Sequence, residues 1–141
     1  STSILSDAGH RMLVNREQSP GGFSLGYYTG TGNRLTAWIN TAGAWQSILF
    51  STAMTLNTIN CWGIVYDGAN ISAYLNGVSD ATPVAKTGDM GGGTQNVEIG
   101  AESTAHGLNW QGLIGEIWVY NRALSAFEIL HIYNATKWRY A

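Results

Sequence analysis

The sequence predicts an all-β domain in which two antiparallel sheets form a sandwich, with one short helix near the C-terminus. Two observations indicate strands: runs rich in β-branched and aromatic residues recur between Gly, Asn and Asp, and several runs alternate apolar with polar residues. Helical periodicity, the third observation, occurs at one place only, close to the C-terminus. The chain has 141 residues, of which 45% are hydrophobic. This length fits a single domain over residues 1–141 and excludes a multidomain enzyme.

Eight short runs carry the strand pattern. They are residues 12–16, 22–28, 34–40, 47–50, 61–66, 70–75, 97–101 and 112–120. The dipeptides Asp67-Gly68 and Asn76-Gly77 tolerate the positive φ angles of tight hairpin turns, so three consecutive antiparallel strands are predicted around them. Residues 86–95 lack periodicity and contain three consecutive glycines, which predicts a mobile loop. A phosphate-binding glycine loop would need a helix after it, and a strand pattern follows instead.

The helical signal lies at residues 125–135. Ser125 and Glu128 have the spacing of a capping box, in which each side chain bonds the backbone amide of the other residue. Apolar residues then recur at helical spacing. These residues are Phe127, Ile129, Leu130 and Tyr133. We expect a short helix that covers one end of the sandwich.

Composition narrows the classes of function. Charged residues make up only 11% of the chain and the formal net charge is −2, so no positive field exists to attract nucleic acid. No apolar stretch approaches the ~20 residues of a membrane span, and the start of the chain lacks a secretory leader. The single cysteine, Cys61, lies in an apolar run, where we expect an inert, buried thiol.

Strand parity predicts which tryptophans point outward. In residues 34–40 the aliphatic side chains occupy alternate positions, so Trp38 lies on the opposite face. The same count in residues 112–120 places Trp118 opposite the aliphatic side chains. Either these rings form an exposed binding surface, or a loop, the helix or another layer covers them.

Three segments carry a family resemblance. They are IVYDG at 64–68, YLNG at 74–77 and GLIGEIWVYNRALSAFEI at 112–129. Together they resemble the laminin G-like, concanavalin A-like jelly-roll family, which implies two antiparallel sheets packed face to face. The ending IYNATKWRY at 132–140 resembles the tail of such modules in bacteriophage structural proteins. This second likeness implies a virion surface, in preference to another extracellular setting.

The chain departs from the family pattern at three places. Gly115 stands where the family usually has Asp, and Ile59 stands where a Trp often opens the strand. Family members also supply two or three strands before residues 12–16, so the chain is short by that amount. Either a preceding segment supplies those strands, or the open sheet edge pairs with another chain. We expect a homo-oligomer or an assembly with other virion or surface chains.

Glycoside hydrolases occur on this type of sandwich, and they need two carboxyl groups about 5 to 9.5 Å apart. Here Glu116 is followed at same-face positions by Trp118 and Tyr120 rather than by a second acid. The acids Glu98 and Glu102 flank the end of a predicted strand. The three histidines have no metal-ligand spacing. They are His10, His106 and His131. We therefore expect no catalysis, with a remnant glycoside hydrolase as the remote alternative.

The resemblance also implies calcium as an optional cofactor, because relatives often bind it at a sandwich rim through oxygen ligands. The candidate ligands are Asp67, Asn70, Asn76 and Asp80. The alternative is that these side chains only hold the hairpin turns by bonding nearby amides.

The leading functional hypothesis is a non-catalytic recognition or structural module on an outer surface, such as a capsid decoration, appendage or fibre. A saccharide suits this surface because its hydroxyls can bond Asn, Ser and Thr while its apolar ring face lies on an aromatic side chain. Candidate contact residues are Trp38, Trp45, Trp110, Trp118, Tyr27 and Tyr28. The alternatives are a purely architectural module, whose aromatic residues anchor a protein interface, and a secreted lectin domain.

Overall fold

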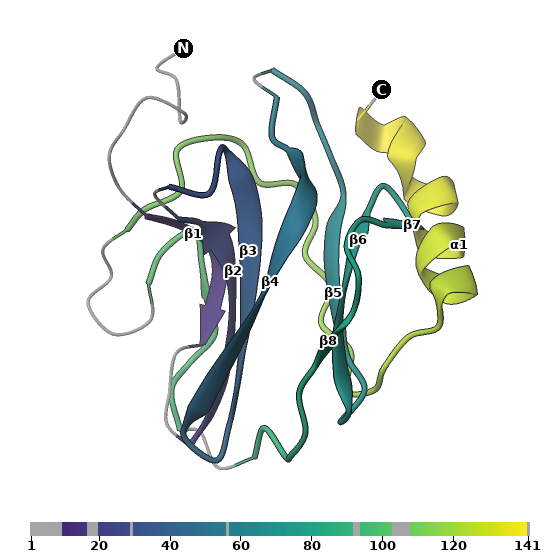
Figure 1. The fold of residues 1–141 in the computed structure, drawn as a ribbon. Helices are drawn as coiled ribbons and strands as arrows, with labels where there is room; N and C mark the ends of the chain where they lie inside the picture. Colours follow the sequence, from purple (N-terminus) through teal and green to yellow (C-terminus); the bar gives the residue numbers. More distant parts are fainter. Residues whose placement is uncertain are drawn as a thin grey trace.

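The protein is a sandwich of two antiparallel sheets that lie face to face (Figure 1). The structure, a computed structural model, describes residues 10–16, 20–28, 30–55, 57–91, 94–102 and 108–140. Within these residues one sheet has five strands and the other has four. The all-β sandwich prediction is confirmed.

The five-stranded sheet has the order β4-β3-β2-β1-β9. Its strands are β1 (Arg11–Arg16), β2 (Gly21–Tyr27), β3 (Arg34–Thr41), β4 (Ala44–Ala53) and β9 (Glu98–Ile99). Register is continuous across its centre, where Ser24 of β2 lies opposite Trp38 of β3, which in turn lies opposite Ser47 of β4. The strand predicted at 97–101 is shorter than expected, since only β9 forms there.

The four-stranded sheet contains β5 (Trp62–Tyr66), β6 (Asn70–Leu75), β7 (Val78–Ser79) and β8 (Val84–Ala85). Strands β5, β6 and β7 follow one another as predicted, and β8 also pairs with β6. Gly68 has φ +88° and Gly77 has φ +84°, so both hairpins use the backbone conformation that glycine adopts most easily. β5 stands at the edge of this sheet.

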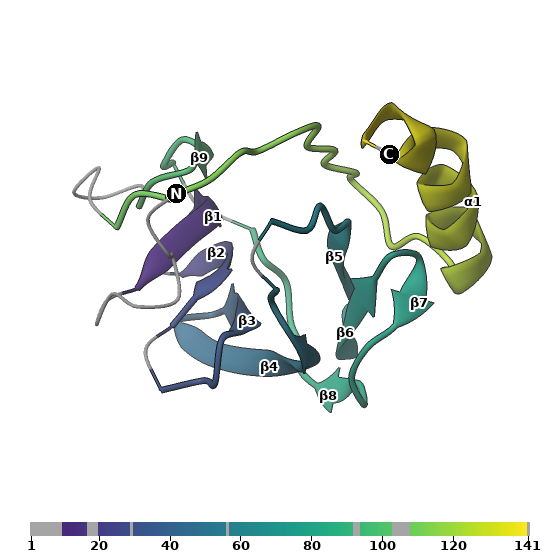
Figure 2. The ribbon, with the colours of Figure 1, turned by 90° about the horizontal axis from the view of Figure 1, so that it is seen from above.

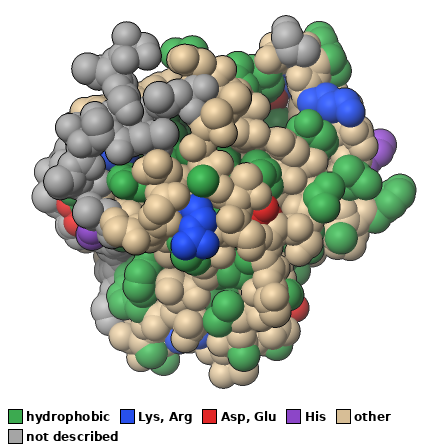
Figure 3. Space-filling view, turned by 45° about the horizontal axis from the view of Figure 1, so that its top comes forward, with side chains coloured by type: hydrophobic (Ala, Val, Ile, Leu, Met, Phe, Trp, Pro, Cys, Tyr) green, Lys and Arg blue, Asp and Glu red, His purple; other side chains and the backbone are tan. Residues whose placement is uncertain are grey.

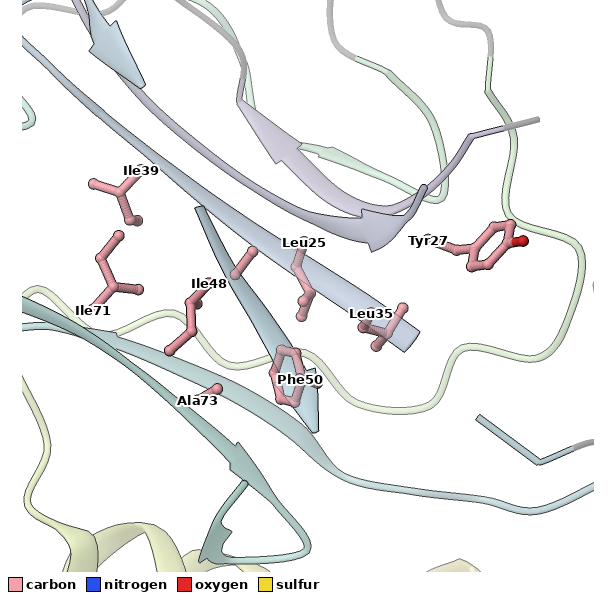
Figure 4. Close-up of a cluster of buried hydrophobic side chains, with 9 residues drawn as sticks. Leu25, Tyr27, Leu35, Ile39, Ile48, Phe50, Ile71 and Ala73 are labelled. Atoms are coloured by element: carbon pink, nitrogen blue, oxygen red, sulfur yellow. The ribbon is translucent and has the colours of Figure 1, made fainter. Parts of the chain in front are cut away.

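The core lies between the sheets (Figure 4). Strand β3 contributes every second residue, as the two-residue period of a strand requires. The fully or nearly fully buried members are Leu25, Tyr27, Leu35, Ala37, Ile39, Ile48, Phe50, Ile71 and Ala73. Only Ile71 and Ala73 among these come from the four-stranded sheet. The opposing layer is completed by half-buried residues such as Trp62 and Ile64.

The predicted helix is present as α1 (Ala126–Thr136), followed by a 3₁₀ turn, η1 (Lys137–Tyr140). Ser125 is its N-cap, and both bonds of the capping box with Glu128 are formed. The helix lies beside β7, on the side of the four-stranded sheet away from the five-stranded sheet (Figure 2). It therefore covers this outer side rather than an end of the sandwich.

The strand predicted at 112–120 does not form, so this prediction is wrong. In the described chain none of these residues pairs with a strand. The backbone N–H of Glu116 instead donates to the hydroxyl of Tyr140, at 3.0 Å. Gly115 packs so closely on Tyr140 that an added Cβ would lie 2.8 Å from its hydroxyl oxygen. A two-residue apolar period is present here, but a strand also needs a hydrogen-bonded neighbour.

Candidate functional site

The best candidate site lies on the outer face of the five-stranded sheet. Leu35, Ala37 and Ile39 of β3 are core residues, so the alternate residues between and after them point away from the core. On the same face lies Tyr28, which directly follows β2. Strand β4 contributes Trp45: the even-numbered Ile48 and Phe50 of this strand point into the core, so the odd-numbered Trp45 points outward. We call the surface formed by Tyr28, Trp38 and Trp45 the aromatic face.

Two of the three rings of the aromatic face are in contact with each other. The ring centroids of Tyr28 and Trp38 are 5.9 Å apart, and the planes are tilted by 57°. Tyr28 also contacts the His10 ring at 4.7 Å, and its hydroxyl lies 3.2 Å from Oγ of Ser24. Trp45 lies opposite Asn40 in the register of β3 and β4 and is 38% exposed. Tyr28 and Trp38 are half-buried, so Trp45 is the ring that a ligand reaches most easily.

Polar groups without partners lie in the same row of β3. In this row, four buried side-chain atoms have no hydrogen-bond partner within the described residues. They are Oγ1 of Thr36, Nε1 of Trp38, and Oδ1 and Nδ2 of Asn40. The Asn40 side chain has no exposed surface. A buried polar atom without a partner is costly, so such a group needs water or a ligand to satisfy it.

The structure brings three of the six predicted aromatic residues together and separates the other three. Tyr27, adjacent to Tyr28 in sequence, points to the opposite face of the sheet and is buried in the core (Figure 4). Trp110 is half-buried and packs against the core. Trp118 is 42% exposed but lies beside the other sheet, on the segment that forms no strand.

The proposed calcium ligands lie in turns. Oδ1 of Asp67 accepts hydrogen bonds from the backbone N–H groups of Ala69, at 2.8 Å, and Asn70, at 2.6 Å. These bonds to the ionised carboxylate lower the pKa of Asp67. Asn70 opens β6, so these two residues share one hairpin. The contacts favour a role in forming the turn.

The other two proposed ligands directly follow strands: Asn76 follows β6 and Asp80 follows β7. Oδ1 of Asn76 accepts from the backbone N–H of Cys61, at 2.9 Å, and its amide donates to Asn60. Asp80 joins the two sheets, since it accepts from the backbone N–H of Thr52 at 3.0 Å and from its hydroxyl at 2.5 Å. Within the described residues, no group of three or more His, Cys, Asp or Glu side chains is placed to hold a metal ion.

The carboxylates near the C-terminus are held by arginines. Glu116 forms an ion pair with Arg139. Glu128 bonds Arg122 through both oxygens, at 2.7 and 3.1 Å. Arg122 first, and the Ser125 bonds second, lower the pKa of Glu128 from 4.5 to about 2. These ion pairs hold residues 116–122 against α1 and η1.

A large cavity, which the sequence did not predict, lies between the edge of β5 and residues 110–124. Its volume is about 1290 Å³. The five-stranded sheet lines it with apolar residues that include Leu13, Phe23 and Leu25. Cys61 also lines it, and burial raises the pKa of this thiol, which is the opposite of what activates a cysteine.

No helix in the described part of the chain has the length and apolar character of a membrane span.

Comparison with known proteins identifies the family. Residues 3–130 match Laminin_G_3, described as the concanavalin A-like lectin/glucanases superfamily. Among curated proteins none matches. A similar solved structure is that of an S-layer domain-containing protein from Clostridium thermocellum, with 16% sequence identity and a TM-score of 0.42. The similarity covers 93% of this chain and 66% of that chain, which is less than two thirds of its length. Because the family match spans most of the sequence, the chain belongs to the Laminin_G_3 family of the concanavalin A-like lectin/glucanases superfamily.

Proposed function

We propose that the protein is a non-catalytic recognition module that binds a saccharide through the aromatic face. One observation carries this proposal: three aromatic rings and a row of buried, unpartnered polar atoms lie on the same side of one sheet. An aromatic ring offers a flat apolar surface to the ring face of a sugar, and neighbouring polar groups select its hydroxyls. We assign Trp45 to stacking. We assign Asn40 and Thr36 to hydrogen bonds that form once the side chains above them move, because their polar atoms have no exposed surface in the free protein.

The low charge of the chain suits a neutral ligand. Only 11% of the residues are charged, so long-range attraction of an ionic ligand contributes little. We place the module on a virion or another extracellular surface, because residues 132–140 resemble the tail of modules found there. Its partners in that setting are other surface chains.

The arrangement of acids supports a non-catalytic role. A glycoside hydrolase requires one carboxyl group that donates a proton and a second that acts as a nucleophile or base. In the described chain Glu116 is bound to Arg139, and Glu128 to Arg122. Asp67 and Asp80 accept hydrogen bonds from backbone amides. These bonds give a structural role to four of the seven acids among the described residues.

A glycan array with three proteins tests the proposal. The wild-type protein should bind a selective set of glycans, and Trp45→Ala should lose that binding while its circular dichroism spectrum stays unchanged. Trp138→Ala is the matched control, because Trp138 is also exposed but lies in η1, outside the five-stranded sheet. Equal binding by Trp45→Ala and wild type, or no binding by wild type, would refute the saccharide proposal.

A second candidate function, a purely architectural interface, is favoured by a different surface. Phe127 of α1 is 78% exposed and Trp138 of η1 is 68% exposed. Hydrophobic side chains gather over this C-terminal region in the space-filling view (Figure 3). Large exposed aromatics of this kind often anchor protein interfaces. Sedimentation velocity distinguishes the two functions. If the role is architectural, the wild-type protein forms an assembly that dissociates in Phe127→Ser and stays intact in Trp45→Ala.

A further inference from the structure

We propose that the cavity beside β5 is a slot for one β-strand supplied by another polypeptide chain. This inference is independent of saccharide binding, because the slot and the aromatic face belong to different parts of the molecule. Its basis is the backbone of β5, the volume of the cavity and the character of its lining.

The backbone of β5 offers an open sheet edge. Asp67 N–H donates to Asn70 C=O, and Asn76 N–H donates to Cys61 C=O. Hydrogen bonding alternates along an antiparallel strand, so the odd-numbered residues 61–67 bond β6. The N–H and C=O groups of Trp62, Ile64 and Tyr66 therefore point away from β6. In the described chain no strand pairs with β5 on that side.

The opposite wall of the cavity is also unpaired. Residues 112–120 line the cavity but belong to no strand, although their alternating apolar pattern is that of a strand. Leu113 and Val119 in this wall are exposed. A polypeptide strand between the two walls can bond β5 on one side and this segment on the other. No other common ligand presents N–H and C=O groups at the required alternating spacing.

The volume of the cavity fits a single strand. A strand rises about 3.3 Å per residue, lies about 4.8 Å from its neighbour, and belongs to a layer about 10 Å thick, which gives about 160 Å³ per residue. The cavity of about 1290 Å³ therefore holds about eight residues at this packing. This room is too small for a folded second copy of the chain, so we assign it to one extended segment.

The lining specifies an uncharged, apolar segment. One side of the slot consists of core residues such as Leu25 and Ile39, and the other includes Ile129 and Ile132 of α1. A strand covered on both faces has aliphatic residues along its whole length. The charged lining residues are Asp67, Glu116 and Arg122. The last two are already bound in ion pairs, so the slot offers little to a charged occupant.

The test uses a synthetic probe with an acetylated run of eight Val, Ile and Thr residues and two C-terminal Lys residues for solubility. Amide hydrogen exchange is measured by NMR with and without this peptide. In the free protein, the Trp62, Ile64 and Tyr66 amides should exchange much faster than those of Gly63 and Val65. The peptide should slow the exchange of the first group. A version N-methylated at alternate residues cannot donate to the edge and should have no effect.

A matched pair of variants locates the binding. Ile59 lines the cavity and Val78 does not, and both side chains are 62% exposed. Ile59→Asp should weaken peptide binding about tenfold, since a carboxylate at the slot loses hydration, whereas Val78→Asp should leave binding unchanged. Equal binding of the methylated peptide would overturn the proposal. So would slow exchange at Trp62, Ile64 and Tyr66 in the free protein at every protein concentration, because the chain itself would then occupy the edge.

Discussion

Phe50 of β4 and Trp62 of β5 meet edge to face between the two sheets, with ring centroids 5.1 Å apart and planes at 82°. Phe50 is fully buried, while Trp62 is half-buried and lies at the edge of the cavity. This pair is therefore a direct link between the two layers, close to the proposed slot. Edge-to-face aromatic pairs add about 0.5–1.5 kcal/mol to the free energy gained from burial.

Phe50→Ala should lower the free energy of unfolding by about 3–5 kcal/mol, because it removes a large buried side chain and leaves a cavity. Leu49→Ala is the matched control: Leu49 precedes Phe50 on β4 but points outward and is exposed. Its cost should stay below about 1 kcal/mol. Chemical denaturation measures both. Equal losses for the two variants would show that the sheets do not pack through Phe50.

The contact between the β6–β7 hairpin and α1 depends on Gly77. A Cβ at this position would lie 3.0 Å from Cδ1 of Leu130 and 3.1 Å from Cβ of Tyr133. Gly68 has a similar positive φ, but a Cβ there would have open space around it. Gly68→Ala should therefore cost only the backbone strain of about 1–2 kcal/mol.

Gly77→Ala should cost more than Gly68→Ala, because it adds the displacement of α1 to a similar backbone strain. Hydrogen exchange in α1 should accelerate only in Gly77→Ala, since only this substitution pushes the helix away. Thermal unfolding and exchange together measure the difference. If both variants lose the same stability and protect α1 equally, the helix does not dock on this hairpin.

The hydrogen bonds of the ionised Glu128 carboxylate at the N-terminus of α1 should persist to low pH. The pKa of Glu128 is lowered to about 2 from 4.5. The contribution of its ionised form to stability is therefore complete above about pH 4.5 and is lost as the pH falls from there through about 2. NMR titration of the Glu128 side chain should give a midpoint near 2. Arg122→Gln should raise this midpoint, whereas Arg139→Gln, which breaks the Glu116 pair instead, should not. An unchanged midpoint in Arg122→Gln would contradict this account.

Asp67 provides a test that separates turn formation from calcium binding. Its carboxylate accepts two backbone hydrogen bonds, and an amide oxygen can accept the same bonds. Asp67→Asn should therefore keep the melting temperature near that of wild type, while Asp67→Ala lowers it. Added calcium should shift none of the three melting temperatures. A calcium-dependent rise in wild type that both variants lose would instead identify Asp67 as a metal ligand.

The sequence predicted the elements whose signals are local. The Asn76-Gly77 turn, the capping box at Ser125 and the alternating pattern of β3 each follow from a few neighbouring residues, and all are present in the structure. Residues 112–120 have an equally clear local pattern, yet they form no strand. Pairing depends on a neighbouring edge, and no property of residues 112–120 alone reveals the distance to β5.

The candidate site was predictable only in part for the same reason. Parity identified the outward position of Trp38, and its partners on the aromatic face come from β4 and from the end of β2. Tyr27 and Tyr28 could not be separated before the core face of β2 was known. The unpartnered amide of Asn40 could not be predicted from the sequence, because a missing hydrogen bond depends on all the groups that surround the side chain in the folded protein.

Saccharide binding at the outer face of the five-stranded sheet can be followed through the six indole N–H signals of the protein. An oligosaccharide selected on the glycan array is titrated into ¹⁵N-labelled protein. If this face binds the sugar, the Trp38 and Trp45 signals shift in a saturable manner, while those of Trp62, Trp110, Trp118 and Trp138 stay in place. Shifts confined to Trp118 or Trp138, with Trp38 and Trp45 unchanged, would contradict it.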